Sequence, residues 1–245
     1  MDSKEKYSKF LELKNELDYR GINYQKDLDI LMPKIELRES GKQFTIRDHT
    51  KGLVFSKLSA LQKFSRIEEN HDSIVALFHN FNIDYIKATS AETFIDELKK
   101  LGCLGLVTRA QIKSLHQNIE VLEKIAEVFG SIDNYYQSVN LLNLICELAN
   151  PASNYKLRGL GIPLVSEYLR NVGMDIIKPD VHICRILYQW GYCHENYDGK
   201  MDEKAFREIY NICFNIAKTF GIRMVEVDTI IWRGGESGVA YRLND

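Results

Sequence analysis

Apolar residues recur at every third or fourth position over most of this chain, which is the spacing of one face of an α-helix. In residues 109–129 these positions share a face, and Gly130 follows as a stop signal. The same spacing predicts helices over residues 4–20, 44–62, 90–101, 134–149 and 203–220. Before residue 90, Thr89 and Glu92 have the spacing of a capping box. Only residues 224–232 alternate with period two, and we expect a helix there too, because a lone strand has no sheet to join.

The composition is that of an ordinary soluble protein. Of the 245 residues, 45% are hydrophobic and 27% are charged, and proline and glycine are scarce. No apolar run approaches the roughly 18–20 residues of a membrane helix, and the polar N-terminus does not resemble a secretory signal. The five cysteines are odd in number and are not spaced for zinc or an iron–sulfur cluster. We therefore expect reduced thiols and a cytoplasmic protein.

The net charge of −2 gives no overall argument for a nucleic-acid partner, so such an argument must rest on local features. Residues 42–66 are locally basic, with six basic residues against the single acid Asp48. This stretch is either an ordinary solvated helix face or a surface that faces phosphates.

A glycine-rich turn occupies residues 157–163, which read Leu-Arg-Gly-Leu-Gly-Ile-Pro. Gly159 and Gly161 allow a tight turn with positive φ, and Pro163 suits the first turn of a following helix. Such a turn exposes N–H groups and the positive end of a helix dipole, which bind phosphate without any net positive charge. Taken alone, the pattern also fits a plain turn between two packed helices.

A second motif occupies residues 178–185, which read Lys-Pro-Asp-Val-His-Ile-Cys-Arg. Pro179 ends the preceding segment, Asp180 stands at an N-cap position, and apolar residues follow at helical spacing. Taken alone, Asp180 is an ordinary helix cap and His182 a structural hydrogen-bonding residue.

Together, in this order, the two motifs resemble the helix-hairpin-helix DNA glycosylase superfamily, the fold of endonuclease III and its relatives. The family pattern is a hydrophobic-x-Gly-hydrophobic-Gly hairpin, a helix, and a loop that ends in an Asp followed by x-His-hydrophobic-x-Arg. Residues 157–161 and 180–185 match these two parts. The resemblance covers residues 44–235 and leaves residues 1–43 unassigned.

The resemblance implies an all-α fold of two helical subdomains with a cleft between them. Residues 1–43 plus 164–245 would form a terminal subdomain that contains Asp180. Residues 44–163 would form a subdomain like a six-helix barrel that ends in the hairpin.

The implied activity is base-excision repair: hydrolysis of the N-glycosidic bond of an alkylated or oxidised purine flipped out of double-stranded DNA. Asp180 would be the catalytic residue, steadying an oxocarbenium-like transition state, activating water, or both. Bifunctional members carry a lysine two residues after the second hairpin glycine, where this chain has Pro163. We therefore predict a monofunctional enzyme without lyase activity. Members that lack the iron–sulfur motif, as this chain does, are typically alkylpurine-type or 8-oxoguanine-type.

The resemblance also implies the DNA-binding residues, namely the hairpin residues Arg158, Gly159, Leu160 and Gly161 together with a wedge from residues 53–62. That wedge, which fills the gap left by the flipped base, would be Lys57, Leu61 or Gln62. His182 and Trp232 are candidates for the base pocket, although both are also typical structural residues. We expect no cofactor, apart from a monovalent cation that the hairpin backbone could hold. The expected partner is double-stranded DNA with a damaged base, and the expected protein is a monomer, nucleoid-associated in a prokaryote, with no membrane contact.

Two alternatives belong to other functional classes. One is a non-catalytic module that binds DNA through the hairpin but has no base pocket. The other is a helical interaction protein in which the Gly-x-Gly turn is coincidental. An aromatic-lined cleft that holds Asp180 would favour the enzyme, and hairpin N–H groups left open to a phosphate would favour DNA binding over the interaction protein.

Overall fold

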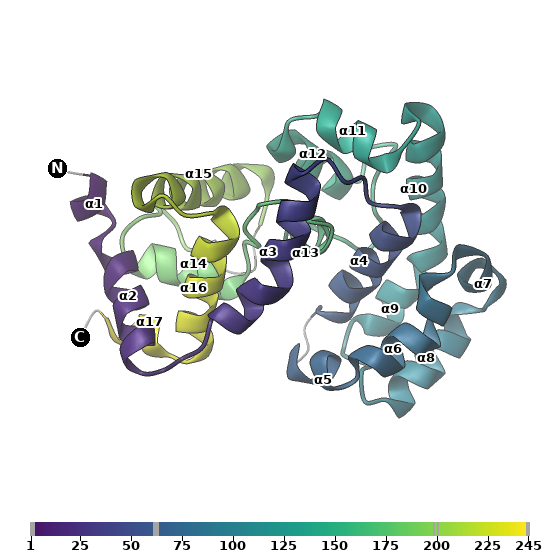
Figure 1. Cartoon of the computed structure of the whole chain (residues 1–245), viewed down its shortest axis with the longest axis horizontal. Helices are drawn as coiled ribbons and strands as arrows, with labels where there is room; N and C mark the ends of the chain where they lie inside the picture. The colour runs from purple at the N-terminus through teal and green to yellow at the C-terminus, as the bar shows by residue number, and fades with distance from the viewer. Residues whose placement is uncertain (1–2, 61–63, 198, 200, 244–245) are drawn as a thin grey trace. The chain divides into compact units, whose positions relative to one another are not determined.

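The structure is a computed structural model that describes residues 3–60, 64–197, 199 and 201–243 (Figure 1). Within these residues the chain forms α-helices and one short 3-10 helix and no strand, so the predicted all-α class is confirmed. The chain divides into two compact units. The terminal unit is Met1–Ser40 with Gly173–Asp245, and the middle unit is Gly41–Val172.

The terminal unit is built around helix α16. Its helices are α1 (Ser3–Lys6), α2 (Ser8–Tyr19), α3 (Gln25–Glu39), α14 (Val181–Gln189), α15 (Glu203–Phe220), α16 (Met224–Glu236) and α17 (Val239–Arg242). Two glycines in the last turn of α16 allow its neighbours to approach closely. A Cβ at Gly234 would lie 2.7 Å from Leu13 of α2, and one at Gly235 would lie 2.7 Å from His182 of α14. Larger residues at these two positions would force α2 and α14 away from α16.

The middle unit contains the other helices. They are α4 (Ile46–Leu58), α5 (Phe64–Glu69), α6 (His71–Leu77), η1 (His79–Phe81), α7 (Ile83–Ala88), α8 (Ala91–Lys100), α9 (Thr108–Lys113), α10 (Leu115–Phe129), α11 (Ile132–Ser138), α12 (Leu141–Ala149) and α13 (Ile162–Asn171). Helix α4 is buried along most of its length and packs against α9, α10 and α13. Thr45 and Asp48 close a capping box at its N-terminus.

Helices α4 and α13 pack at short range because α4 carries Gly52. A Cβ at Gly52 would lie 3.0 Å from Val172 Cγ1 and 3.2 Å from Asn171 Cβ. Two hydrogen bonds also join the helices: Ser56 Oγ donates to the Leu164 carbonyl at 2.6 Å, and Asn171 Nδ2 donates to the Gly52 carbonyl at 3.2 Å. Both contacts fix α13, the helix that follows the hairpin.

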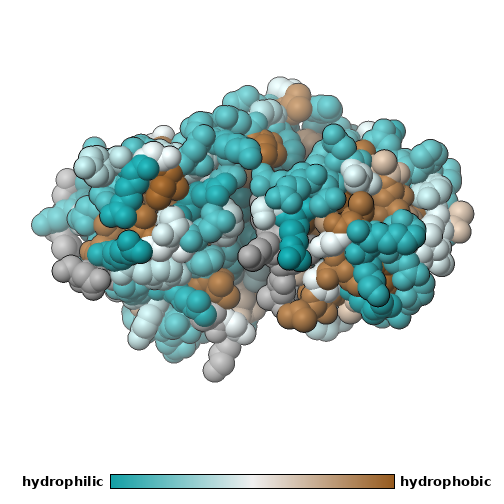
Figure 2. All heavy atoms as spheres, turned by 90° about the horizontal axis from the view of Figure 1, so that it is seen from below, coloured by the Kyte–Doolittle hydropathy of each residue, from teal (hydrophilic) through white to brown (hydrophobic). Residues whose placement is uncertain are grey.

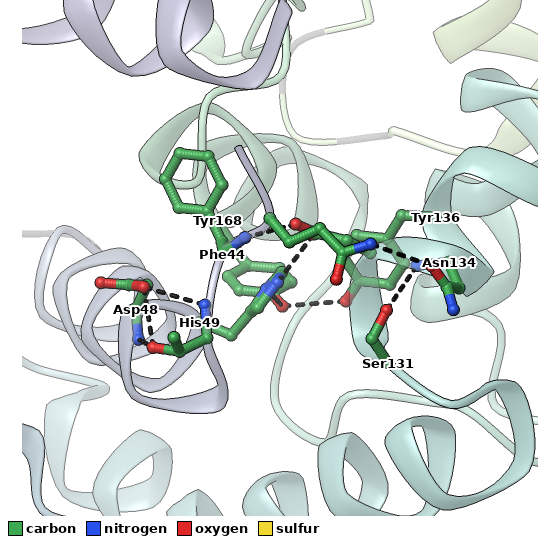
Figure 3. A network of polar contacts seen from close by, with 10 residues as sticks. Phe44, Asp48, His49, Ser131, Asn134, Tyr136 and Tyr168 are labelled. Atoms are coloured by element: carbon green, nitrogen blue, oxygen red, sulfur yellow. Dashed lines mark hydrogen bonds and ion pairs between the residues drawn. The ribbon is translucent and has the colours of Figure 1, made fainter. Parts of the chain in front are cut away.

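A buried polar network strengthens this pairing (Figure 3). His49 of α4 lies between two partners, with Nε2 3.0 Å from Asp133 Oδ1 and Nδ1 2.7 Å from the Tyr168 hydroxyl. The Tyr136 hydroxyl lies 2.8 Å from that of Tyr168, and Asp133 Oδ2 accepts the Phe44 N–H at 2.5 Å. His49 and Asp133 are fully buried, so each depends on these partners. The network holds α4, α11 and α13 in one arrangement.

Three predicted helices are each interrupted once, namely those over residues 4–20, 109–129 and 134–149. The second breaks at Ser114, whose hydroxyl donates to the Gln111 carbonyl at 2.9 Å and competes with the helical pattern. The third breaks before Asn140, whose side chain accepts the Leu142 N–H and starts a new helix. The apolar periodicity continues across these breaks, which is why the sequence alone predicted single helices.

Other local predictions can be compared directly with the structure. The helix over residues 203–220 is confirmed as α15, and residues 224–232 lie within α16. The cap of α8 is Ser90, which accepts the Thr93 N–H, so the predicted Thr89 cap is wrong by one residue. The two compact units place residues 41–43 and 164–172 with the middle unit, whereas we expected both segments in the terminal subdomain.

The surface that Figure 2 shows is mostly hydrophilic, with separate small apolar patches. None of the helices in the described ranges is both long and apolar enough to cross a membrane.

Candidate functional site

The two hairpin glycines have different conformations. Gly159 has φ +79°, and a Cβ there would lie 2.6 Å from Gln111 Oε1, so both its backbone and its surroundings require glycine. Gly161 has φ −84° and ψ −179°, which is extended backbone that any residue can adopt. A Cβ at Gly161 would meet only Pro163 Cδ, at 3.9 Å. The positive φ expected of this turn is thus confined to Gly159, and the fold leaves space at Gly161.

Side chains of α4, α9 and α10 hold the hairpin from inside the middle unit. The Arg158 carbonyl accepts hydrogen bonds from Lys57 Nζ at 3.1 Å and Asn118 Nδ2 at 3.0 Å, and it lies 3.1 Å from Ser114 Oγ, whose one proton it shares with the Gln111 carbonyl. Asn118 Oδ1 accepts the Arg158 N–H at 2.6 Å, and Gln111 Nε2 donates to the Gly159 carbonyl at 2.7 Å. This buried platform fixes the backbone of the turn.

The outer side of the hairpin offers backbone donors. Among the described residues, the N–H groups of Gly159, Gly161 and Ile162 have no hydrogen-bond partner. Gly161 is exposed and is the N-cap of α13, and it has no side chain to satisfy the first turn. A helix N-terminus with open N–H groups attracts anions. The hairpin therefore has the geometry of a phosphate-binding turn.

The predicted hairpin residues contribute in different ways. Leu160 is buried, with 1% of its surface exposed, so only its backbone is available to a ligand. Its carbonyl accepts a hydrogen bond from the ammonium of Lys156, which is half-buried. Burial lowers the pKa of Lys156. Arg158 is exposed, and its side chain can reach a solvent ligand.

The prediction that Lys57 contacts DNA directly, or acts as the wedge, is wrong. Its side chain is fully buried, and its ammonium donates to Ser114 Oγ at 2.8 Å, the Arg158 carbonyl at 3.1 Å and Gln111 Oε1 at 3.3 Å. Burial, and secondly the nearby charge of Lys156, lower the pKa of Lys57 to about 7. Leu61 and Gln62, the other wedge candidates, lie outside the described residues.

Asp180 is the N-cap of α14, as predicted. Its Oδ1 accepts the N–H groups of His182 at 2.9 Å and Ile183 at 3.1 Å. In the described part of the chain, Oδ2 has no hydrogen-bond partner, and the residue is partly exposed. Hydrogen bonds to one oxygen fix the carboxylate, while the other oxygen remains open to a substrate or a water.

Two aspartates of the terminal unit position the loop that leads to Asp180. Asp228 Oδ1 accepts the Lys178 N–H at 2.6 Å, and Asp175 Oδ1 accepts the Val225 N–H at 3.0 Å. Asp228 is almost fully buried, with 3% of its surface exposed. Both bonds tie the loop to α16, so the Asp180 backbone is anchored on the central helix of its unit.

The predicted base-pocket residues have structural partners. His182 lies against Gly235, and its Nδ1 is 3.1 Å from the Tyr241 hydroxyl, which links α14 to α17. Trp232 is partly exposed, and the Arg233 guanidinium stacks on its ring at 4.9 Å from the centroid. The packing of His182 is thus explained without a ligand, and a base-stacking role for Trp232 stays a prediction.

Sequence reasoning missed Leu106, which has 92% of its surface exposed. It lies in the turn between α8 and α9, where the Gly105 N–H donates to Thr108 Oγ1 at 2.9 Å and the Thr108 N–H donates to the Gly105 carbonyl at 3.3 Å. These reciprocal bonds fix a tight turn that presents Leu106 to solvent. The sequence signal was an apolar segment interrupted by Gly102 and Gly105, which cannot form one buried helix face.

Comparisons with known proteins agree with the motifs. No protein-family model matches the chain. An Aquifex aeolicus protein named 8-oxoguanine DNA glycosylase/AP lyase is 30% identical over 115 residues, which are 46% of this chain and 49% of the relative. A Methanocaldococcus jannaschii protein of the same name is 34% identical over 142 residues, 58% of this chain and 61% of the relative. The chain thus matches about half to three fifths of the length of these relatives.

Solved structures match over almost the whole chain. The 8-oxoguanine DNA glycosylase of M. jannaschii has a TM-score of 0.63 at 22% identity, covering 95% of this chain and 96% of that one. The glycosylase/lyase of that organism in complex with a 15mer DNA containing 8-oxoguanine has a TM-score of 0.60 at 24% identity, covering 92% and 94%. The 8-oxoguanine DNA glycosylase of Thermotoga maritima has a TM-score of 0.63 at 17% identity, covering 91% and 93%. The chain therefore has the same fold as these 8-oxoguanine DNA glycosylase structures, in agreement with the fold that the hairpin and Asp180 motifs implied.

Proposed function

We propose that this protein is a DNA glycosylase that removes an oxidised purine, with 8-oxoguanine as the first substrate to test. The observation that carries the proposal is the pair of helix N-termini: open N–H groups at the hairpin before α13, and a fixed carboxylate with one open oxygen at α14. The names of the relatives support glycosylase activity and this base. An alkylated purine, which the sequence equally favoured, is the second substrate class.

The hairpin and Asp180 would divide the work between binding and chemistry. The hairpin N–H groups bind a phosphate of the duplex and hold the DNA in register. Asp180 acts on the flipped nucleotide: the C1′–N bond breaks with its electron pair leaving on the base, and a water adds to C1′. The Asp180 carboxylate stabilises the positive charge on the sugar and accepts the proton of that water.

We further propose that base removal is hydrolytic and that the protein lacks lyase activity. A lyase step needs an amine that attacks C1′, and Pro163, at the position of the family lysine, has none. Lys57 is fully buried under the hairpin, and the Lys156 ammonium is bound to the Leu160 carbonyl. The names of the relatives include a lyase activity, so this part of the proposal needs its own experiment.

Leu106 is our candidate for the side chain that enters the duplex when the base leaves the stack. Exposed apolar side chains that insert between base steps are a recurrent device of DNA-distorting proteins. Leu106 stands on a turn fixed by hydrogen bonds, two residues before α9, whose Gln111 holds the hairpin. It replaces Lys57 in that role.

The activity experiment uses duplexes that differ only in one base: 8-oxoguanine, an alkylated purine or guanine. Abasic sites are revealed by hot alkali, and untreated samples report strand cleavage by the protein itself. We expect alkali-dependent cleavage only with a damaged base. Duplex binding without any base release would instead support the non-catalytic module, and neither binding nor release would support the helical interaction protein.

The lyase question is decided by borohydride reduction during the reaction with the preferred lesion. We expect abasic sites to accumulate without a covalent protein–DNA adduct. An adduct that survives denaturation would contradict the hydrolytic mechanism, and its loss in Lys156→Ala or Lys178→Ala would identify the attacking amine.

A further inference from the structure

The hairpin backbone does not fit the monovalent cation that we considered from the sequence. Such an ion is held by carbonyl oxygens, and a donor already on such an oxygen competes with it, most strongly when that donor is itself a cation. Each carbonyl of residues 157–161 accepts a hydrogen bond within the described chain: Leu157 from the Leu160 N–H, Arg158 from Lys57, Ser114 and Asn118, Gly159 from Gln111, Leu160 from Lys156, and Gly161 from the Leu164 and Val165 N–H groups. Two of these donors are ammonium groups, which would repel a metal cation.

The two ammonium groups bind a specific pair of peptide groups. Lys57 donates to the Arg158 carbonyl, and the N–H of that same peptide belongs to Gly159. Lys156 donates to the Leu160 carbonyl, and the N–H of that peptide belongs to Gly161. The N–H groups of Gly159 and Gly161 are two of the hairpin donors left without a partner in the described residues.

In a trans peptide the carbonyl and the N–H point in opposite directions, and no cis peptide occurs in the described chain. A cation at the oxygen therefore polarises the group and strengthens the N–H on the far side as a donor. A buried charge is also less screened by salt than an exposed one, so its effect reaches through the peptide.

We propose that the buried Lys57 and the half-buried Lys156 supply the hairpin with the positive charge that binds a DNA phosphate, acting through the Arg158–Gly159 and Leu160–Gly161 peptides. They take the place of a bound metal cation. The inference rests on the proposed DNA-binding function and adds the source of the charge. It also explains how a chain with a net charge of −2 can present a phosphate site.

The Lys57 side chain also has as many hydrogen-bond acceptors around it as an ammonium group has N–H donors. Its three acceptors, Gln111 Oε1, Ser114 Oγ and the Arg158 carbonyl, match the three N–H groups of the charged form. Gln111 Nε2 is already used on the Gly159 carbonyl, so its oxygen is left to accept. The platform can therefore accept all three N–H groups of the charged lysine.

The first experiment measures duplex affinity by fluorescence anisotropy in potassium chloride and in choline chloride at equal ionic strength. Choline is too large to bind between carbonyl oxygens. We expect the wild-type dissociation constants in the two salts to agree within about twofold, since the charge is covalently part of the protein. A wild-type affinity that falls several-fold in choline would show that a metal ion is required and would overturn the proposal.

The second experiment removes the charge. Lys156→Met should weaken duplex binding about tenfold or more, as expected for a charge-assisted hydrogen-bond system, and should lower the salt slope by about 0.9. Lys156→Arg should retain most of the affinity. The matched control is Lys99→Met, which removes one exposed charge from α8 of the same unit and should change affinity less than threefold. Thermal melting of each variant confirms that it is folded.

A scan with single methylphosphonates neutralises one phosphate of the duplex at a time. It distinguishes an effect of the Lys156 charge on phosphate binding from a purely structural effect of Lys156 on the hairpin. One position should weaken wild-type binding and have little further effect on Lys156→Met. An equal loss in both proteins at every position, or a Lys156→Met variant that binds like Lys99→Met, would overturn the proposal.

A wild type that binds the duplex but releases no base would contradict the glycosylase proposal alone, whereas one that binds no duplex would overturn both. Lys57→Met repeats the test at the second peptide and is read only if it melts as a folded protein.

Discussion

The N-termini of α13 and α14 answer the same physical need in opposite ways. Both helices begin with N–H groups that lack an intrahelical acceptor. At α14 the protein itself supplies the acceptor, because Asp180 Oδ1 accepts the N–H groups of His182 and Ile183. At α13 the cap is Gly161, which has no side chain, and the N–H groups remain open.

This difference indicates which helix N-terminus can bind an external anion and which can hold a reactive carboxylate. An open helix start attracts an external anion, so α13 suits a phosphate. A helix start occupied by its own carboxylate is not open to another anion, but its N–H groups hold that carboxylate in place, which is what a catalytic Asp requires. Under the proposed function, the same backbone feature would serve binding in the middle unit and chemistry in the terminal unit.

The largest expected effect is on the α14 side. Asp180→Asn keeps an oxygen for the cap and removes the charge, so base release should fall by about 10²–10⁴-fold while duplex affinity changes little. Single-turnover assays and anisotropy on the same duplex measure the two quantities. A variant as active as the wild type would remove Asp180 from the mechanism.

Substitutions in the hairpin should instead reduce duplex affinity. Gly161 and Gly159 provide a matched pair of variants. Gly161→Val should fold normally, because the site has extended φ and open space, but should weaken duplex binding more than tenfold by covering the N–H groups. Gly159→Ala should instead lose about 1–2 kcal/mol of stability from its positive φ alone, and more from contact with Gln111. Denaturant unfolding and anisotropy separate the two effects. A folded Gly161→Val variant with unchanged affinity would rule out a hairpin–phosphate contact.

A third variant asks whether the middle unit does more than bind phosphate. Leu106→Ala should slow base release about tenfold, because an apolar wedge lowers the cost of holding the base outside the stack, and should leave stability unchanged. The control is Val128→Ala, which changes an exposed apolar residue of α10, and it should behave as wild type. Equal rates for both variants would exclude Leu106 as the wedge.

The sequence predicted the all-α class, the hairpin and the Asp180 cap because each depends on local spacing and backbone chemistry. It did not predict the burial of Lys57. A lysine in a basic stretch is normally solvated, and only the folded unit brings Gln111, Ser114 and the Arg158 carbonyl around it. The breaks at Ser114 and Asn140 were hidden for a related reason: polar side chains redirected the backbone while the apolar spacing continued.

The smallest expected effect is a pH dependence confined to the α13 side. The groups around Lys57 are neutral Gln111 of α9, neutral Ser114 just before α10, the Arg158 carbonyl, and the Lys156 ammonium of the hairpin segment. With a pKa of about 7, lowered first by burial and then by Lys156, Lys57 loses its charge as the pH rises above neutrality. Duplex affinity should therefore fall a few-fold between about pH 6.5 and 8.5, because the Arg158–Gly159 peptide is no longer polarised.

Stability should move the other way over the same range. The folded pKa lies below the unfolded value of 10.5, so between about pH 7 and 10.5 the unfolded chain binds more protons, and the contribution of Lys57 to stability grows with pH by at most about 1.4 kcal/mol per unit. Urea unfolding and anisotropy at matched pH values test both signs, and Lys57→Met should flatten both curves between pH 6.5 and 8.5. Affinity that stays constant or rises with pH in the wild type would show that the hairpin binds phosphate without the charge of Lys57. The open N–H groups at the start of α13 would then be sufficient for binding.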